Sequence, residues 1–307
     1  MFVIIDIYFM PVVSIIIQLY LVIAVGYLLA KIFKVDNKIL TYFAVYFSLP
    51  CLMFYGVYTG GYDWKIIIMP AVYVLLNILV LVFAYLYAKI FRYNYEDQSI
   101  ISVLSWAGNN ANFGIPVIVA LLGPAALPVT ALMVLVNTVF MIGPGAYLFA
   151  REKGSFKKTC IKILKLPLIY AVALGLIFNI FKVHLPELVT GPIQLIGQAL
   201  VPTQLILTGT FLVGLKYTKI DWKLITPSLV FKLIIMPWLG WLLIKFLGLP
   251  FDNNAYVMLI EAAAPFAVLT VSLADLYKRK PEQVAIASFL SLIGVTFTLP
   301  IFWLLVK

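Results

Sequence analysis

Long apolar runs dominate this sequence of 307 residues. A helix needs about 20 apolar residues to cross roughly 30 Å of hydrocarbon, and runs of that length recur along the whole chain. Because the runs are continuous and do not alternate with a period of two, they predict membrane helices and not barrel strands. The expected fold class is an all-α polytopic membrane protein with ten transmembrane helices, at approximately 11–32, 39–58, 66–91, 99–122, 125–149, 163–181, 188–215, 222–247, 254–275 and 283–306.

The composition agrees with a membrane protein and argues against an enzyme. Hydrophobic residues make up 64% of the chain and charged residues 11%, far from the balance of a soluble globular protein. The sequence has one histidine and two cysteines in different surroundings. It therefore offers no convergent nucleophile, base or metal cluster. We expect no catalytic activity, no bound metal and no organic cofactor.

Basic residues are distributed unevenly among the connections between the runs. Most Lys and Arg residues follow the odd-numbered runs, whereas the connections on the other side hold only Lys65, Lys182, Lys245 and Lys307. The positive-inside rule therefore predicts a multi-pass protein of the cell membrane with both termini extracellular. The basic connections on one side of the lipid bilayer also explain the net charge of +10. No nucleic-acid partner is therefore expected.

Short sequence matches recur in the same order in the two halves of the chain. Three pairs agree in order: Ile32–Val35 with Ile180–Val183, Leu49-Pro50 with Val201-Pro202, and Asp63–Lys65 with Asp221–Lys223. Each half has five runs, an odd number, so the second copy must be inserted upside down, as in the inverted repeats of secondary transporters. We expect one repeat at 1–150, a basic cytoplasmic linker at 151–165 and an inverted repeat at 166–307.

The fourth run contains a polar stretch, Gly108–Pro116, with three asparagines, two glycines and a proline. Proline lacks an N–H, glycine lowers helix propensity, and asparagine amides are costly in hydrocarbon. We expect two half-helices joined by unwound backbone, which is stable at membrane depth only where protein buries it or a polar cavity wets it. The repeat predicts a second break in the ninth run at Glu261–Phe266, where Pro265 lies.

The two breaks are expected to cross near the middle of the membrane and to form an anion site. Proline is favoured at the start of a helix, so Pro116 and Pro265 are each expected to open a second half-helix. Unpaired N–H groups and two positive helix ends would then face one cavity. Asn109, Asn110 and Asn112 would add amides that bind a carboxylate, and Asn112 is preferred because it lies nearest the proline. Alternatively, the asparagines only satisfy the broken backbone and neighbouring helices.

Ionisable residues within the runs are costly in a membrane and are therefore candidates for function. Lys232 lies near the centre of the eighth run, where it could attract an anionic substrate, carry a proton or pair with Glu261. Glu261 is the candidate proton carrier or ligand of a coupling cation. For both residues the alternative is a structural role. Asp275, close to the basic residues 278–280, is expected to form an interfacial salt bridge.

Two weaker candidates lie in the second run. Ser48 and Cys51 flank Pro50, where a kink would expose backbone to the same cavity. They are therefore included among the predicted substrate-binding residues. If transport is coupled to an ion, the ion is expected to be a proton or sodium.

These motifs resemble the auxin efflux carrier family, which contains plant PIN carriers and prokaryotic permeases. The resemblance rests on Asn109–Val117, Ser48–Pro50 and Ala262–Pro265, and it extends over essentially the whole chain. It implies ten helices in two inverted repeats, a scaffold of spans 1, 2, 6 and 7, a transport domain of the other spans, and elevator-like motion. It also implies a homodimer and organic-anion substrates such as auxins or dicarboxylates. By motif match, Asn112, Pro116 and Pro265 are the crossover positions.

The sequence therefore predicts a secondary transporter of a small organic anion, an auxin-like carboxylate or a dicarboxylate. The bile-acid sodium symporters share the implied architecture, so a sodium-coupled organic-anion symporter is the alternative within transport. A membrane receptor that binds its ligand without carrying it across is the alternative outside transport. Sodium dependence of uptake distinguishes the sodium-coupled symporter from a carrier that does not use sodium. Flux across the membrane distinguishes a transporter from a receptor.

Overall fold

The structure is a computed structural model that describes residues 10–33, 37–60, 64–150, 167–213 and 219–306. Within these residues the regular secondary structure is helical, apart from one isolated antiparallel bridge between Gly108 and Phe266. Six helices there are long and apolar enough to cross a membrane, by length and composition. The expected all-α polytopic membrane class is therefore confirmed. The predicted linker, 151–165, lies outside the described residues.

Helices in the first half of the chain follow the predicted runs. The first run forms α2 (Met10–Phe33), and the third forms a 3-10 turn (Trp64–Ile67) and α5 (Ile68–Ile90). The second run forms α3 (Asn37–Phe43), a π-helical turn (Ala44–Ser48) and α4 (Leu49–Thr59). The fourth forms α6 (Tyr95–Leu104), a π-helical turn (Asn110–Gly114) and α7 (Ile115–Leu122). The fifth forms a 3-10 turn (Pro124–Ala126), α8 (Leu127–Phe140), a π-helical turn (Met141–Gly145) and α9 (Ala146–Ala150).

The second half follows the predicted runs with one difference. It forms α11 (Pro167–Ile180), α12 (Glu187–Gln198), α13 (Leu200–Val213), α14 (Trp222–Val230), a π-helical turn (Phe231–Ile235), α15 (Met236–Phe246), α16 (Asn253–Ala263), α17 (Leu269–Leu276) and α18 (Pro281–Val306). The run 188–215, expected to be one span, is divided between α12 and α13 at Ala199. Pro202 lies in the first turn of α13, where its missing N–H costs no helical bond, which favours a helix start there.

Local sequence explains where several helices begin. The side chains of Asn94, Asp221 and Asp252 cap α6, α14 and α16 by accepting a backbone N–H three residues further on. Three other helices, α4, α7 and α15, start just after a π-helical turn and have proline as their second residue. The proline ring clashes with the carbonyl four residues earlier and leaves it unpaired, and a widened turn accommodates this clash.

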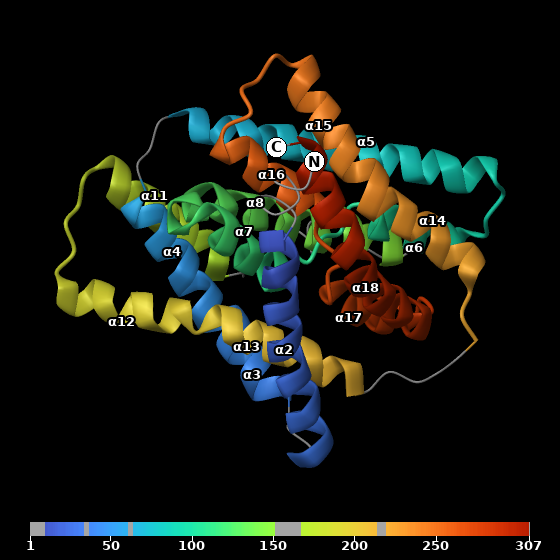
Figure 1. The fold of residues 1–307 in the computed structure, drawn as a ribbon, viewed down its shortest axis with the longest axis horizontal. Helices are drawn as coiled ribbons and strands as arrows, with labels where there is room; N and C mark the ends of the chain where they lie inside the picture. The colour runs from blue at the N-terminus through green and yellow to red at the C-terminus, as the bar shows by residue number, and fades with distance from the viewer. Residues whose placement is uncertain (1–9, 34–36, 61–63, 151–166, 214–218, 307) are drawn as a thin grey trace.

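The helices pack in groups that bring distant segments together. Helix α2 packs along α13, and α4 packs against α11 and α12. On the other side of the molecule α5 contacts α6 and α15, α16 packs on α15, and α17 packs on α18. Figure 1 shows α4, α11 and α12 on one side, α6, α14, α17 and α18 on the other, and α7 and α8 between them.

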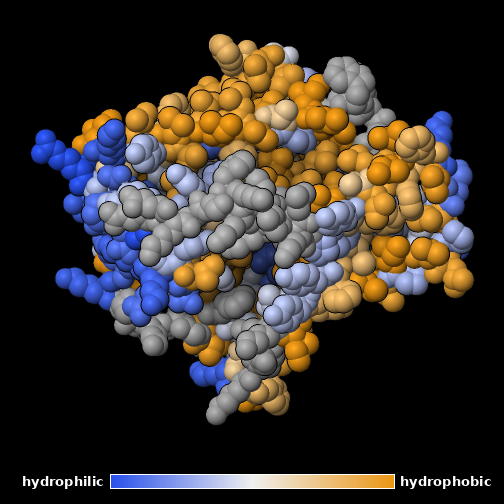
Figure 2. Space-filling model, turned by 180° about the vertical axis from the view of Figure 1, so that it is seen from behind, coloured by the Kyte–Doolittle hydropathy of each residue, from blue (hydrophilic) through white to orange (hydrophobic). Residues whose placement is uncertain are grey.

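The outer surface is largely apolar. Large hydrophobic side chains are exposed on many helices, including α2, α5 and α18. In Figure 2 apolar side chains cover much of the visible face, and hydrophilic ones gather mainly at its left and right edges. Such a belt is expected of a protein surrounded by lipid hydrocarbon.

Glycines allow α2 and α13 to approach closely. A Cβ placed on Gly209 of α13 would lie 2.6 Å from the backbone nitrogen of Tyr27, and one on Gly26 of α2 would lie 2.8 Å from the carbonyl carbon of Ile206. Both contacts involve backbone atoms, which cannot move aside as a side chain can. The two helices are therefore packed backbone to backbone, as small residues permit in membrane proteins.

We expect Gly209→Val to destabilise the protein because its side chain would force α2 and α13 apart. Overpacking typically costs about 1–3 kcal/mol, which corresponds to a fall in Tm on the order of 5 °C. Gly191→Val is the matched control, since Gly191 is also helical but has open space around it. Thermal unfolding in detergent measures both variants. Equal Tm values for the two would contradict the close packing of α2 on α13.

Candidate functional site

Two non-helical segments lie against each other in the interior of the fold. One is Ala107–Asn109, between α6 and the turn that precedes α7, and the other is Pro265–Ala267, between α16 and α17. The N–H of Asn109 donates to the carbonyl of Pro265 at 2.7 Å, and the N–H of Ala267 donates to the carbonyl of Ala107 at 2.9 Å. These two segments are called the crossing below.

Side chains from two other helices satisfy two further backbone groups of the crossing. The amide of Asn137 in α8 donates to the carbonyl of Gly108 at 2.8 Å, and the hydroxyl of Ser291 in α18 accepts the N–H of Phe266 at 2.9 Å. Asn137 and Ser291 are both buried. Sequence reasoning gave Ser291 no role, because nothing around it in the chain indicates that its partner lies 25 residues away.

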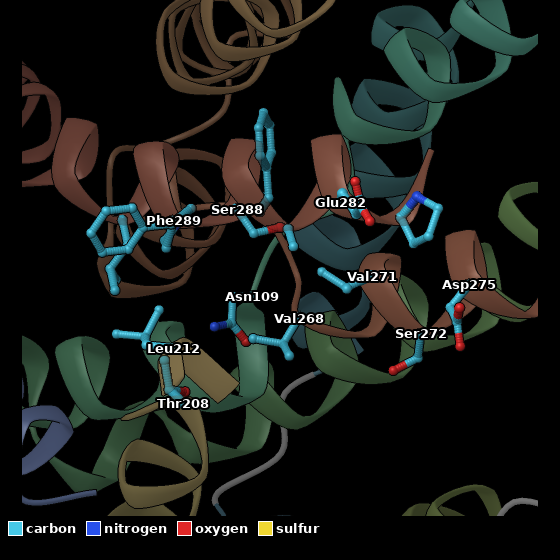
Figure 3. Close-up of a pocket in the computed structure, with 15 residues that line it drawn as sticks. Asn109, Thr208, Leu212, Val268, Val271, Ser272, Asp275, Glu282, Ser288 and Phe289 are labelled. Carbon is cyan, nitrogen blue, oxygen red and sulfur yellow. The ribbon is translucent and has the colours of Figure 1, made fainter. Parts of the chain in front are cut away.

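A cavity of about 480 Å³ lies beside the crossing. Its walls come from the crossing, α13, α17 and α18, and Figure 3 shows Asn109 directed into it from the crossing. The side chain of Asn109 is only 7% exposed, yet it takes part in no side-chain hydrogen bond among the described residues. Its amide opens on the cavity, so its hydrogen-bond partner there is water or a ligand.

The cavity differs in chemistry from one end to the other. Leu212 and Phe289 form one end, and the carboxyl groups of Asp275 and Glu282 lie at the other, with Asn109 between the ends (Figure 3). Both acidic residues are exposed. The cavity therefore has an apolar end, a central amide and an acidic, wet end.

A second polar cluster lies behind the crossing and does not line the cavity. Lys232 and Glu261 are both completely buried there. The ammonium of Lys232 donates to the carbonyl of Ala262 at 2.9 Å and lies 3.5 Å from the carbonyl of Glu261. The amide of Asn110 donates to the hydroxyl of Tyr73 at 2.9 Å. Among the described residues no ion pair within 4.0 Å joins Lys232 to the Glu261 carboxylate.

The predicted substrate-binding residues are therefore not all together. Asn109 and Pro265 line the cavity, whereas Asn110 and Lys232 lie behind the crossing. Asn112, preferred on sequence grounds, is half-buried in the π-helical turn and lies outside the cavity lining. The closeness of Asn112 to Pro116 in the sequence did not indicate that Asn109, and not Asn112, faces the cavity.

Neither proline opens a helix in the way expected. Pro116 is the second residue of α7, but the π-helical turn extends the helical segment back to Asn110, so its start lies six residues before the proline. Pro265 precedes α17 by four residues, because Phe266 and Ala267 are held extended by their hydrogen bonds in the crossing. The amide-rich helix start therefore lies at Asn110 and not at Pro116.

The candidates of the second run lie apart from the cavity. Ser48 is fully buried at the end of its π-helical turn, and its hydroxyl has no hydrogen-bond partner among the described residues. Cys51 is half-buried in α4. Both lie where α4 packs on α12, and neither lines the cavity beside the crossing.

An ion-pair cluster joins the ends of three helices near the acidic end of the cavity. Lys280 contacts Asp97 at 2.6 Å and Asp221 at 3.4 Å. Partial burial lowers the pKa of Lys280, but the two carboxylates outweigh burial and raise it above its usual value. Asp275 was expected to pair with this basic stretch, but it faces the cavity instead. The pairing of Lys280 with residues of α6 and α14 depends on tertiary structure, which sequence proximity did not indicate.

Two comparisons with known proteins agree with the membrane architecture. A family model described as "Membrane transport protein" matches residues 11–303. An uncharacterized transporter of Methanocaldococcus jannaschii is 26% identical over 294 residues, which cover 91% of this chain and 92% of the relative.

The crossing should be sensitive to the loss of Asn137. Asn137→Leu removes the donor to the buried carbonyl of Gly108, and an unsatisfied buried group costs about 1–3 kcal/mol. Asn77→Leu is the matched control, because Asn77 is equally buried but its amide has no partner among the described residues. We expect Asn137→Leu to lower the Tm in detergent and Asn77→Leu to leave it unchanged or raise it. A Tm of Asn137→Leu that is equal to or higher than that of Asn77→Leu would show that Asn137 does not stabilise the crossing.

Proposed function

This chain belongs to the membrane transport protein family, the family of the auxin efflux carriers, and from that premise we propose that it is a secondary transporter of a small organic anion. The proposed mechanism is alternating access of elevator type, with the substrate bound beside the crossing. The single observation that carries the proposal is the amide of Asn109, which faces the cavity and has no side-chain hydrogen bond among the described residues.

The chemistry around Asn109 favours an anion. Its amide N–H groups can donate to a carboxylate without placing a full cation in the membrane. The helical segment Asn110–Leu122 starts beside it, and a helix start carries unpaired N–H groups and a partial positive charge. In secondary transporters, half-helix starts of this kind point at anionic groups of the substrate.

The two ends of the cavity favour one orientation of that anion. The acidic end, with Asp275 and Glu282, repels a carboxylate, whereas Leu212 and Phe289 offer contacts to an apolar group. We therefore propose that the carboxylate binds at Asn109 and the apolar part of the substrate extends toward the end formed by Leu212 and Phe289. This orientation favours a monocarboxylate with an apolar body over a dicarboxylate.

Paired helix contacts support the proposal of ten spans in two inverted repeats. The first span packs on the seventh (α2 on α13), and the sixth packs on the second (α11 on α4). Within the halves, the contact of the third span with the fourth (α5 with α6) corresponds to the contact of the eighth with the ninth (α15 with α16). The interrupted segments, α6 to α7 and α16 to α17, meet in an antiparallel bridge. Such reciprocal pairings are expected if the halves are related by a two-fold axis in the membrane plane.

The location of the cavity supports an elevator mechanism. It lies between α13, which belongs to the scaffold implied by the family, and α17 and α18, which belong to the transport domain. A movement of the transport domain relative to the scaffold would carry a substrate bound at the crossing from one side of the membrane to the other. The acidic end lies at the connection of α17 and α18, on the side that the positive-inside rule places in the cytoplasm. We therefore propose that this conformation faces inward in the cell membrane, with both termini extracellular.

Other predicted residues keep proposed roles in this mechanism. Glu261 is the proposed coupling group, since it is a buried carboxyl group next to the crossing. Asn112, Ser48 and Cys51 lie outside the inward-facing cavity, so any contact with the substrate would belong to another conformation. The proposed assembly is the homodimer implied by the family.

Asn109→Ala should weaken binding of a small organic acid. A hydrogen bond to a charged group contributes about 1.5–3 kcal/mol, so the affinity should fall roughly 10- to 100-fold. Thermal-shift titration with indole acetate, malate and malonate identifies a ligand and gives its affinity for each variant. Asn253→Ala, a change of an exposed asparagine at the start of α16, is the matched control. An unchanged affinity in Asn109→Ala, or a larger loss of affinity in Asn112→Ala, would contradict the proposal that the anion binds at Asn109.

Neutralising the acidic end should help an anion to bind. We expect the double variant Asp275→Asn, Glu282→Gln to increase affinity for the anion several-fold at low ionic strength, because it removes like charge from the entrance. The gain should shrink at high salt, since both groups are exposed and screened. Glu187→Gln, at an exposed position on α12, is the control. A loss of affinity would indicate a cationic or zwitterionic substrate instead.

A further inference from the structure

The position of the Lys232 ammonium is unusual for a buried lysine. It lies at the carbonyl end of α16, 2.9 Å from the carbonyl of Ala262 and 3.5 Å from that of Glu261. Its third neighbour is the sulfur of Met236 at 3.2 Å. A lysine retained only for an ion pair would be expected to contact the carboxylate of Glu261, but this one contacts the end of a helix.

The end of an interrupted helix is a favourable place for a cation. Its last carbonyls have no helical partner and carry partial negative charge. In secondary transporters, such ends together with unwound carbonyls coordinate sodium or protons. Backbone carbonyl, amide and carboxylate oxygens are also the ligands that hard metal cations prefer. The surroundings of Lys232 therefore have the chemistry of a cation site.

Further oxygen atoms converge on the same place. A Cβ placed on Gly108 would lie 2.9 Å from the Lys232 ammonium and 3.3 Å from the Glu261 carbonyl, and it would also contact Oδ1 of Asn110. The absence of a Cβ at Gly108 thus leaves room for all three groups. The Glu261 carboxylate lies nearby against Gly114, where a Cβ would be 2.9 Å from its Cδ atom.

Several of these oxygens have no partner. Oδ1 of Asn110 and both carboxylate oxygens of Glu261 are buried and form no hydrogen bond among the described residues. Asn110 is 1% exposed and Glu261 is fully buried. The cluster therefore has more acceptors than donors around a single positive charge, which is the arrangement expected around a bound cation.

We propose that the ammonium of Lys232 replaces a bound sodium ion at the carbonyl end of α16, so that this protein holds its crossing together without sodium. The carbonyls of Glu261 and Ala262 and Oδ1 of Asn110 are the oxygens that would hold the ion if the lysine were absent. The buried charge of Glu261 is then balanced by a cation that the chain itself supplies. This inference builds on the proposed transport function and excludes its sodium-coupled form, but its test measures cation binding and needs no transport.

The proposal is tested by looking for a sodium response in the wild type and in Lys232→Ala. The full chain is purified in detergent, and its Tm is measured in sodium chloride and in potassium chloride at equal ionic strength. We expect no sodium-specific shift in the wild type. We expect Lys232→Ala to have a lower Tm in potassium and to gain several degrees in sodium, with saturation. Lys245→Ala, which removes a lysine stacked on Trp241 in the same helix segment, should show no sodium response.

A second pair of variants tests the oxygens themselves. Adding Asn110→Ala to Lys232→Ala should abolish the sodium response, because it removes one proposed ligand. Adding Tyr73→Phe should preserve the response, because it removes the same hydrogen bond to Asn110 but leaves Oδ1 in place. The comparison separates loss of a ligand from loss of packing.

The outcomes are distinguishable. A sodium-specific stabilisation of the wild type overturns the proposal, and so does a folded Lys232→Ala protein that sodium does not stabilise. Recovery of folded Lys232→Ala only from sodium-containing buffer supports it. If that variant is recovered from neither salt, Lys232→Ser, which leaves space and a hydroxyl group, is measured with the same expected response. Failure of organic-acid binding would contradict the transport proposal alone, since no organic anion is present in these measurements.

Discussion

Hydrogen bonding of unwound backbone in the interior of a membrane protein is the constraint on which this structure depends. Hydrocarbon offers no partner for an N–H or a carbonyl, so extended backbone at that depth must find partners within the protein. Here two extended segments bond to each other, through Asn109 with Pro265 and Ala267 with Ala107. Asn137 and Ser291 add one hydrogen bond each from α8 and α18. One polar centre therefore links α6, α7, α16 and α17 with α8 and α18, and other polar groups lie on two sides of it.

The two sides of the crossing have different chemistry. On one side Asn109 faces a cavity that is wet at its acidic end. On the other side Lys232 and Glu261 are sealed from solvent, with the ammonium against the carbonyl end of α16. The first arrangement suits a ligand that enters and leaves, and the second suits a cation that the chain itself supplies. This separation is why a substrate role is proposed for Asn109 and a resident-cation role for Lys232.

Much of the architecture was predictable because it follows from hydropathy and backbone chemistry. The apolar runs indicated where the helices lie, and the two polar, proline-containing stretches lie at or beside the non-helical backbone at 107–109 and 264–267. The roles of individual side chains were not predictable, since Asn109 and Asn110 are adjacent in sequence and point to opposite sides of the crossing. Their directions depend on the non-helical backbone at 107–109, which the bridge between Gly108 and Phe266 holds in place.

The central claim is that the crossing carries an organic anion across the membrane, and flux measures this most directly. Proteoliposomes containing the purified protein would be given a radiolabelled organic acid that stabilises it in the thermal screen. We expect saturable uptake above that of empty liposomes, with equal rates in sodium and in potassium. Saturable binding without any uptake would contradict the account and indicate a receptor.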